Sequence, residues 1–103
     1  MTRFGLIGKI KAHPGKGDAL AEVLLDAARD MQGSVPGCES YVIARVPDEP
    51  DAVWVTEVWE SREAHAASLT FDTVKAAIDR GRPLIADFSE RVETVPVGGL
   101  GLG

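Results

Sequence analysis

The segment at residues 57–71, EVWESREAHAASLTF, holds the side chains best suited to proton chemistry. A histidine titrates near neutral pH and is the side chain that enzymes use most often as a general base. The imidazole of His65 could therefore remove a proton from a substrate. One turn later, Ser68 has a hydroxyl that can donate a hydrogen bond to a substrate oxygen but is no base. The alternative for His65 is a partly exposed, inert histidine on a short surface helix.

Three side chains on β-type segments complete the candidate site. Glu57 and Trp59 lie two residues apart, which places them on one face of a strand. Glu57 is either part of the site or a hydrogen-bonded buried carboxylate, and the alternative for Trp59 is a core side chain. Tyr41 offers a phenol hydroxyl; its alternative is a strand residue at a dimer seam. We take Ser68, Glu57 and Tyr41 as candidate substrate-binding residues.

The composition argues against several classes of function. The chain has 103 residues and a net charge of −5, with no cluster of lysine or arginine. It therefore lacks the electrostatic footprint of a nucleic-acid-binding protein. A single cysteine, Cys38, excludes an internal disulfide, and the few cysteines and histidines give no metal-ligand spacing. We expect one domain that carries no haem, flavin or metal.

Nothing in the chain resembles a targeting or membrane segment. The N-terminal stretch MTRFGLIGKIK has neither the long apolar region nor the cleavage site of a signal peptide. No apolar run approaches the roughly 20 residues of a membrane-spanning helix. We therefore expect a cytoplasmic protein.

The hydrophobic pattern predicts six elements. Alternating or continuous apolar residues predict strands over residues 3–12, 38–46, 52–60 and 86–95, with a hairpin loop over 47–51. Apolar stripes with helical spacing predict helices over residues 18–32 and from Ser61, a suitable N-cap, to about Gly81. We assign residues 1–97 to the folded domain. The glycine-rich residues 98–103 are expected to form a flexible tail.

The order strand, helix, strand, strand, helix, strand is the split βαβ plan of the ferredoxin-like fold. The predicted fold is thus α+β, with a four-stranded antiparallel sheet and both helices on one face. The two middle strands carry large apolar residues on both of their faces. A sheet with one face in water should alternate more cleanly between apolar and polar residues. We therefore expect a homodimer in which a second copy covers the other face.

Three stretches resemble one known family. HPGKGDALAEVL after the first strand, PGCESY opening the second, and EVWES before the alanine-rich helix are similar to the antibiotic biosynthesis monooxygenase domain. The resemblance covers roughly residues 3–95 and depends on the order and spacing of the stretches together. It implies a dimeric α/β-barrel with a pocket between each sheet and its own helices.

The resemblance also implies a chemistry. Characterised enzymes of this family oxidise polycyclic phenols or quinols with dioxygen and use neither metal nor flavin. Trp59 matches the family's tryptophan at the end of the third strand, where it could stack against a flat substrate. Many relatives have a histidine at the position of Ser68, and His65 lies one turn earlier on the same helix face. The resemblance thus makes His65 and Trp59 the candidate catalytic residues.

Two functions stay open from the sequence. The first is a cofactor-independent monooxygenase acting on an aromatic phenol or quinol. The second is a non-catalytic dimeric module that binds a small hydrophobic ligand. Haem degradation, found in other relatives, is disfavoured because the matching positions hold Gly8 and about Ile78, neither of which can ligate iron.

Overall fold

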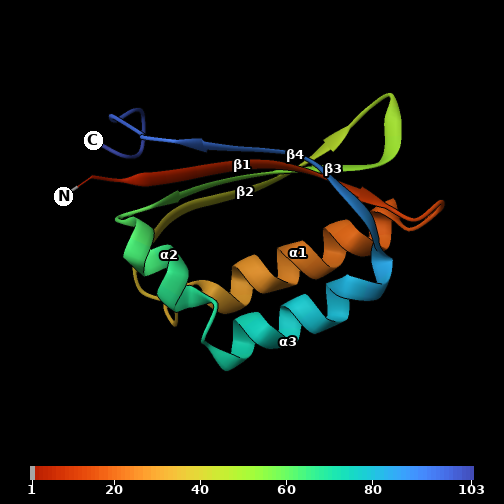
Figure 1. The fold of residues 1–103 in the computed structure, drawn as a ribbon, viewed down its shortest axis with the longest axis horizontal. Coiled ribbons are helices and arrows are strands. Elements are labelled where there is room, and N and C mark those ends of the chain that lie inside the picture. Colours follow the sequence, from red (N-terminus) through yellow and green to blue (C-terminus); the bar gives the residue numbers. More distant parts are fainter. Residues whose placement is uncertain (1) are drawn as a thin grey trace.

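A computed structural model of the chain describes residues 2–103. Its elements are β1 (Phe4–Ala12), α1 (Gly17–Met31), β2 (Cys38–Val46), β3 (Glu49–Trp59), α2 (Arg62–Ser68), α3 (Asp72–Gly81), a 3₁₀ turn η1 (Arg82–Leu84) and β4 (Ile85–Thr94). The four strands form one layer, and α1, α2 and α3 form a second layer on one side of it (Figure 1).

The strands form an antiparallel sheet in the order β2-β3-β1-β4. The first and third strands of the sequence are therefore the central pair, with the other two at the edges. This arrangement confirms the predicted α+β, ferredoxin-like fold. The two connections that contain helices, from β1 to β2 and from β3 to β4, lie on the same side of the sheet (Figure 1).

Two groups of buried side chains fill the space between the layers. The first, which we call the Leu20 cluster, combines Ile10, Ala12, Leu20, Ala21, Val53 and Val55. The second, the Trp59 cluster, combines Phe4, Leu6, Met31, Val35 and Trp59. The members from β1 and from β3 are separated within each strand by even numbers of residues, so they lie on one face of the sheet, as the strand period requires.

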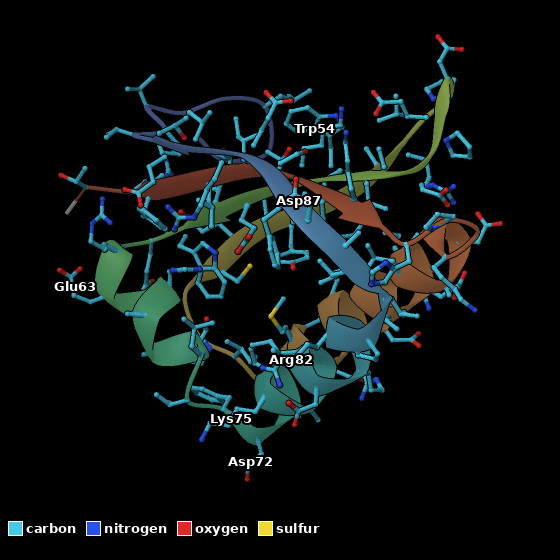
Figure 2. All side chains as sticks on the ribbon, turned by 45° about the vertical axis from the view of Figure 1, so that its right-hand side comes forward. Trp54, Glu63, Asp72, Lys75, Arg82 and Asp87 are labelled. Carbon is cyan, nitrogen blue, oxygen red and sulfur yellow. The ribbon has the colours of Figure 1, made fainter. Side chains whose placement is uncertain are left out.

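None of the helices that residues 2–103 form lies on the opposite face of the sheet (Figure 1). One row across all four strands is made by Val92, Ile7, Thr56 and Val42, which are paired in register. Val42 is 54% exposed and Val92 is 53% exposed. Trp54 also projects from this side (Figure 2). We call this surface the open face.

The hairpin between the second and third strands is tighter than predicted. β3 begins at Glu49, so the connection is shorter than the expected loop over 47–51. Val46 pairs with Glu49 after a register shift, which carries the ladder through this region. Prolines weakened the strand pattern here, but Pro50 is the second residue of β3 and precedes Ala52, where the pairing of β3 with β1 begins. A missing N–H is tolerated at such a strand end.

The single helix predicted from Ser61 to Gly81 is wrong, because the chain breaks between α2 and α3. Ser61 does cap α2, since its hydroxyl accepts a hydrogen bond from the Ala64 amide at 3.0 Å. At the other end, Ser68 and Thr70 each donate a side-chain hydrogen bond to a carbonyl three residues earlier. Such local bonds compete with a regular helix. The break lets α2 and α3 follow different directions along the sheet (Figure 1).

The last residues fold back toward the start of β1. Arg3 donates a hydrogen bond to the Leu102 carbonyl at 2.7 Å, and the Leu102 amide donates to Gly99. The segment lies on the side of the sheet away from the helices (Figure 1). The domain boundary at residue 97 stays a prediction. Among the helices of residues 2–103, none combines the length and apolar character needed to cross a bilayer.

Candidate active site

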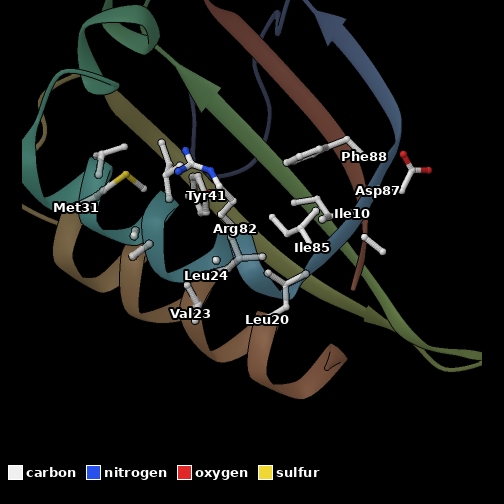
Figure 3. Close-up of a pocket in the computed structure, with 16 residues that line it drawn as sticks. Ile10, Leu20, Val23, Leu24, Met31, Tyr41, Arg82, Ile85, Asp87 and Phe88 are labelled. Atoms are coloured by element: carbon white, nitrogen blue, oxygen red, sulfur yellow. The ribbon is translucent and has the colours of Figure 1, made fainter. Parts of the chain in front are cut away.

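A cavity of about 610 Å³ lies between the sheet and the pair α1 and α3. Leucine, valine, isoleucine and alanine side chains make most of its wall, and β4 closes one side (Figure 3). The polar side chains that line it are Tyr41, Arg82 and Asp87. An apolar hollow with a few polar groups is the usual form of a site for a small organic ligand.

Small residues create this cavity. Ala27 on α1, Ala77 and Gly81 on α3, and Ala86 on β4 all line it. Larger side chains at these positions would fill the space between the layers. The sequence pattern identified this helix face as apolar but did not reveal that its small side chains leave a void. The small residues Ala77 and Gly81 on the inner face of α3 could have indicated this void.

Tyr41 lines the cavity from β2, beside Arg82, on the side of the sheet that carries the helices (Figure 3). It is therefore not on the open face, where a dimer seam would place it. Its register partner on β3 is Glu57. Burial, reinforced by the charges of Glu57 and Cys38, raises the pKa of the Tyr41 phenol. The hydroxyl is consequently neutral at physiological pH and can donate a hydrogen bond.

Glu57 is held by a neighbour on its own strand. The indole nitrogen of Trp59 donates a hydrogen bond to Glu57 Oε1 at 3.0 Å. Burial raises the pKa of the Glu57 carboxyl, while the Trp59 hydrogen bond and the positive charge of Arg91 oppose the rise. Carboxyl groups whose pKa is raised by burial occur often at functional sites, which makes Glu57 a candidate for proton exchange.

His65 faces into the fold from α2. Its ring centroid lies 5.1 Å from that of Phe4 and 5.5 Å from that of Trp59. Its Nε2 lies 3.9 Å from Glu57 Oε1, and its side chain is 17% exposed. Burial lowers the pKa of the imidazole, and the charge of Arg91 lowers it further. The ring is therefore neutral at neutral pH and has a free lone pair.

Ser68 has a structural partner for its hydroxyl. The Oγ atom donates a hydrogen bond to the His65 carbonyl at 2.5 Å, and the residue is 3% exposed. This bond helps to end α2 at Ser68. The side chain thus ties the last turn of the helix to the residue that carries the imidazole.

The cavity lies next to the candidate polar residues but is not lined by most of them. None of Glu57, Trp59, His65 and Ser68 is among the residues that line the cavity. Trp59 is only 1% exposed and packs in its own cluster. The side chains that belong to both regions are Met31, Tyr41 and Val74. Tyr41 is thus the polar side chain that connects the cavity with the Glu57–His65 pair.

A set of charges at the edge of the sheet was not found from the sequence. Arg91 and Glu93 on β4 pair at 3.0 Å, and Arg62 at the start of α2 pairs with Glu93 at 2.8 Å. The Arg62 guanidinium also lies over the Phe4 ring, 4.6 Å from its centroid. Surface ion pairs have no pattern of their own in a sequence, because many charged positions could pair. Across residues 2–103, no group of three or more His, Cys, Asp or Glu side chains could hold a metal ion.

The sequence profile of the family described as antibiotic biosynthesis monooxygenase matches residues 3–80. The matched part includes the first three strands, all three helices up to Arg80, and the Glu57–His65 pair.

The chain belongs to the antibiotic biosynthesis monooxygenase family.

Solved structures agree with this membership. A candidate antibiotic biosynthesis monooxygenase from Chloroflexus aurantiacus is 54% identical, with 98% of this chain and 99% of that chain covered and a TM-score of 0.90. Another from Caulobacter crescentus is 26% identical, with 92% and 88% covered and a TM-score of 0.78. A third from Nitrosomonas europaea, 18% identical with 98% and 94% covered, has a TM-score of 0.79 and shows the shared fold. A search of curated proteins gives no match.

In this antibiotic biosynthesis monooxygenase domain, the buried carboxyl predicts a pH-dependent stability. Because the pKa of Glu57 is raised from 4.5, the folded state holds this proton more strongly than the unfolded state. Stability from this group is present below the unfolded value and is lost as pH rises through the folded pKa. Glu57→Gln keeps an oxygen for Trp59 and removes the charge. The variant should melt a few degrees above the wild type at neutral pH, with the difference vanishing below pH 4.5.

Thermal unfolding of both proteins across this pH range measures the effect. The exposed carboxylate of Glu22 on α1 supplies a control, because Glu22→Gln should leave the melting temperature unchanged. A Glu57→Gln variant that is less stable than the wild type at neutral pH would show that the Glu57 charge is compensated in the fold.

Proposed function

We propose that this protein is a cofactor-independent monooxygenase that oxidises an aromatic phenol or quinol-type substrate with dioxygen. The observation that supports it is the apolar cavity of about 610 Å³ with Tyr41 between it and the Glu57–His65 pair. The volume lies in the range of small-molecule sites. The apolar wall suits a flat ring system, and the single hydroxyl in that wall, from Tyr41, suits a ring oxygen.

The proposed reaction needs only a base, a hydrogen-bond donor and exclusion of water. With an anthrone as an example, the substrate loses a proton and becomes an electron-rich anion. That anion reduces dioxygen, and a carbon–oxygen bond forms to give a hydroperoxide on the ring carbon. Loss of water then breaks the oxygen–oxygen bond and leaves a carbonyl. One oxygen atom enters the product, the other leaves as water, and the substrate supplies all the electrons.

Each candidate residue has a proposed role in this reaction. Tyr41 donates to the substrate oxygen and stabilises the anion, as a neutral phenol in a dry site can. His65 is the base, and Glu57 stabilises the imidazolium that forms. Trp59 orients the Glu57 carboxylate through its indole N–H. Ser68 holds the last turn of α2 and thereby the position of the imidazole.

Dioxygen dependence tests the proposal. Anthrones and naphthoquinols should be consumed in air and not under argon, and isotope-labelled dioxygen should place one labelled atom in an anthrone's product. A reaction without protein gives the background of spontaneous oxidation. Equal consumption with and without the protein across the whole panel would refute the enzyme.

A non-catalytic module that binds a small hydrophobic ligand is the second candidate. The observation that favours it is that the cavity wall does not include Trp59, His65 or Ser68. A ligand could then be held by apolar contacts and the Tyr41 hydroxyl alone. Binding of naphthol with no consumption of any quinol in air would favour this candidate.

We further propose that the open face pairs with a second copy of the chain. Val42 and Val92 are about half exposed, so complete burial of each would contribute roughly half of the about 1.5–3 kcal/mol expected for a fully exposed side chain. Light scattering at micromolar concentration should give twice the 11.0 kDa chain mass. Replacing both valines with lysine should return the 11.0 kDa species, whereas Leu69→Lys, on the helical side, should not. A wild-type species of 11.0 kDa would contradict the proposal.

A further inference from the structure

A second pocket of about 390 Å³ lies between the end of α1 and the edge strand β2. Its wall is more polar than that of the first cavity and includes Arg29, Gln32, Cys38 and Ser40. It lies at the β2 edge of the sheet, away from the open face. A second copy on the open face would therefore leave it accessible.

The two hollows share a thin wall. Among the residues of the described chain, Met31 and Tyr41 line both the apolar cavity and the pocket beside β2. One side of each of these side chains faces the apolar cavity, and another faces the polar pocket. Figure 3 shows Tyr41 beside Arg82, with Met31 on one side of it and Phe88 on the other.

Two features of these side chains favour a movable wall. Methionine is unbranched and has three rotatable bonds, so it adapts to the space around it. Met31 is the last residue of α1, where the helix is no longer continued on its C-terminal side. No hydrogen bond within residues 2–103 engages the Tyr41 hydroxyl, and no buried side-chain oxygen or nitrogen there lacks a partner. The Tyr41 hydroxyl is therefore in contact with space that water can reach.

We propose that the apolar cavity continues into the pocket beside β2 through a gate made by Met31 and Tyr41. The site then takes an elongated ligand, whose aromatic body fills the cavity and whose polar end reaches Gln32 and Ser40. This inference rests on the proposed function for the aromatic nature of the ligand. It adds the length of the ligand and a second binding region for a hydroxyl or amide group.

The single cysteine of the chain reports on the gate. Cys38 lies in the polar pocket and is partly exposed, so a maleimide can reach its thiol from outside. Two probes can then be compared: naphthol, and a naphthol with a hydroxypropyl chain on the far ring. Calorimetry measures their binding, and mass spectrometry measures the rate of Cys38 modification. We expect both probes to bind, and only the longer one to slow modification about tenfold or more.

A substitution in the gate distinguishes a probe that extends from the cavity through the gate from a probe that binds in the polar pocket alone. Met31→Ile keeps the volume of the side chain but adds a branch at Cβ that restricts its rotamers. It should abolish the protection of Cys38 by the longer probe and change the affinity for naphthol no more than a control substitution elsewhere in the same cavity does. Leu24→Ile is the matched control, because Leu24 lines the apolar cavity seven residues earlier on α1 and does not line the polar pocket.

The possible results distinguish the two proposals. If naphthol binds and the longer probe leaves Cys38 modification unchanged, the gate is closed and this inference alone is overturned. Protection that survives in Met31→Ile also overturns it, since the probe then reaches the pocket by another route. If neither probe binds, the proposed function fails together with the inference.

Discussion

Replacing His65 with alanine should lower turnover about 10²–10⁴-fold, the usual cost of removing a general base. The lowered pKa of this imidazole leaves it neutral and able to accept a proton at neutral pH. Replacing Ser68 with alanine should lower turnover by no more than about tenfold. Its hydroxyl already donates to the His65 carbonyl, so its loss removes one ordinary hydrogen bond of about 0.5–1.5 kcal/mol.

The pH profile provides a second readout for His65. Since burial lowers the pKa of His65 from 6.5, kcat/KM should rise with pH and level off with a midpoint below 6.5. His65→Gln should remove this rise, and circular dichroism can show that the variant remains folded. Full activity in His65→Ala would exclude histidine as the base. Glu57, or the acidity of the bound substrate itself, would then account for deprotonation.

Filling the cavity from Gly81 should weaken ligand binding roughly ten- to a hundredfold. Gly81 lines the cavity at the end of α3, and its backbone angles, φ −78° and ψ −32°, are helical. A Cβ atom there would meet Val23 at 3.7 Å, an ordinary contact. Gly81→Leu therefore places a large apolar group in the cavity without backbone strain. It displaces ligand surface worth about 1.5–3 kcal/mol.

The same variant should be more stable than the wild type. Glycine in a helix costs roughly 0.5–1 kcal/mol relative to alanine, and leucine is a good helix former. Opposite effects on binding and stability would separate cavity filling from damage to the fold. Gly81→Ala is the control, with a similar gain in stability and little effect on binding. Unchanged naphthol affinity in a folded Gly81→Leu protein would place the ligand elsewhere.

The sequence predicted the sheet well because strand periodicity is a local property. Apolar residues at every second position predicted a strand over residues 3–12, and the structure has β1 there with Phe4, Leu6 and Ile10 buried on one face. The break after Ser68 was missed for a related reason. Apolar spacing continues across it, and only the side-chain hydrogen bonds of Ser68 and Thr70 reveal the competing local geometry.

The candidate site was harder to predict because it depends on distances between elements. Local spacing placed Glu57 and Trp59 on one strand face but could not show that the indole donates to the carboxylate. The sequence did not show whether the His65 side chain points toward the sheet or toward solvent, since a short helix such as the seven-residue α2 can pack on the sheet with either face. The position of the cavity beside Tyr41, away from Trp59, follows from the packing of α1 against α3. No pattern within one element encodes that packing.

Because the chain is interrupted between α2 and α3, α2 can unfold locally while the rest of the domain stays folded. α2 has seven residues, too few for a helix to persist alone in water. Its attachments to the sheet include the His65 ring against Phe4 and the ion pair of Arg62 with Glu93. Amide hydrogens in α2 should therefore exchange with solvent through local unfolding, well before those of β1 and β3. The imidazole would become accessible in that open state while the rest of the domain stays folded.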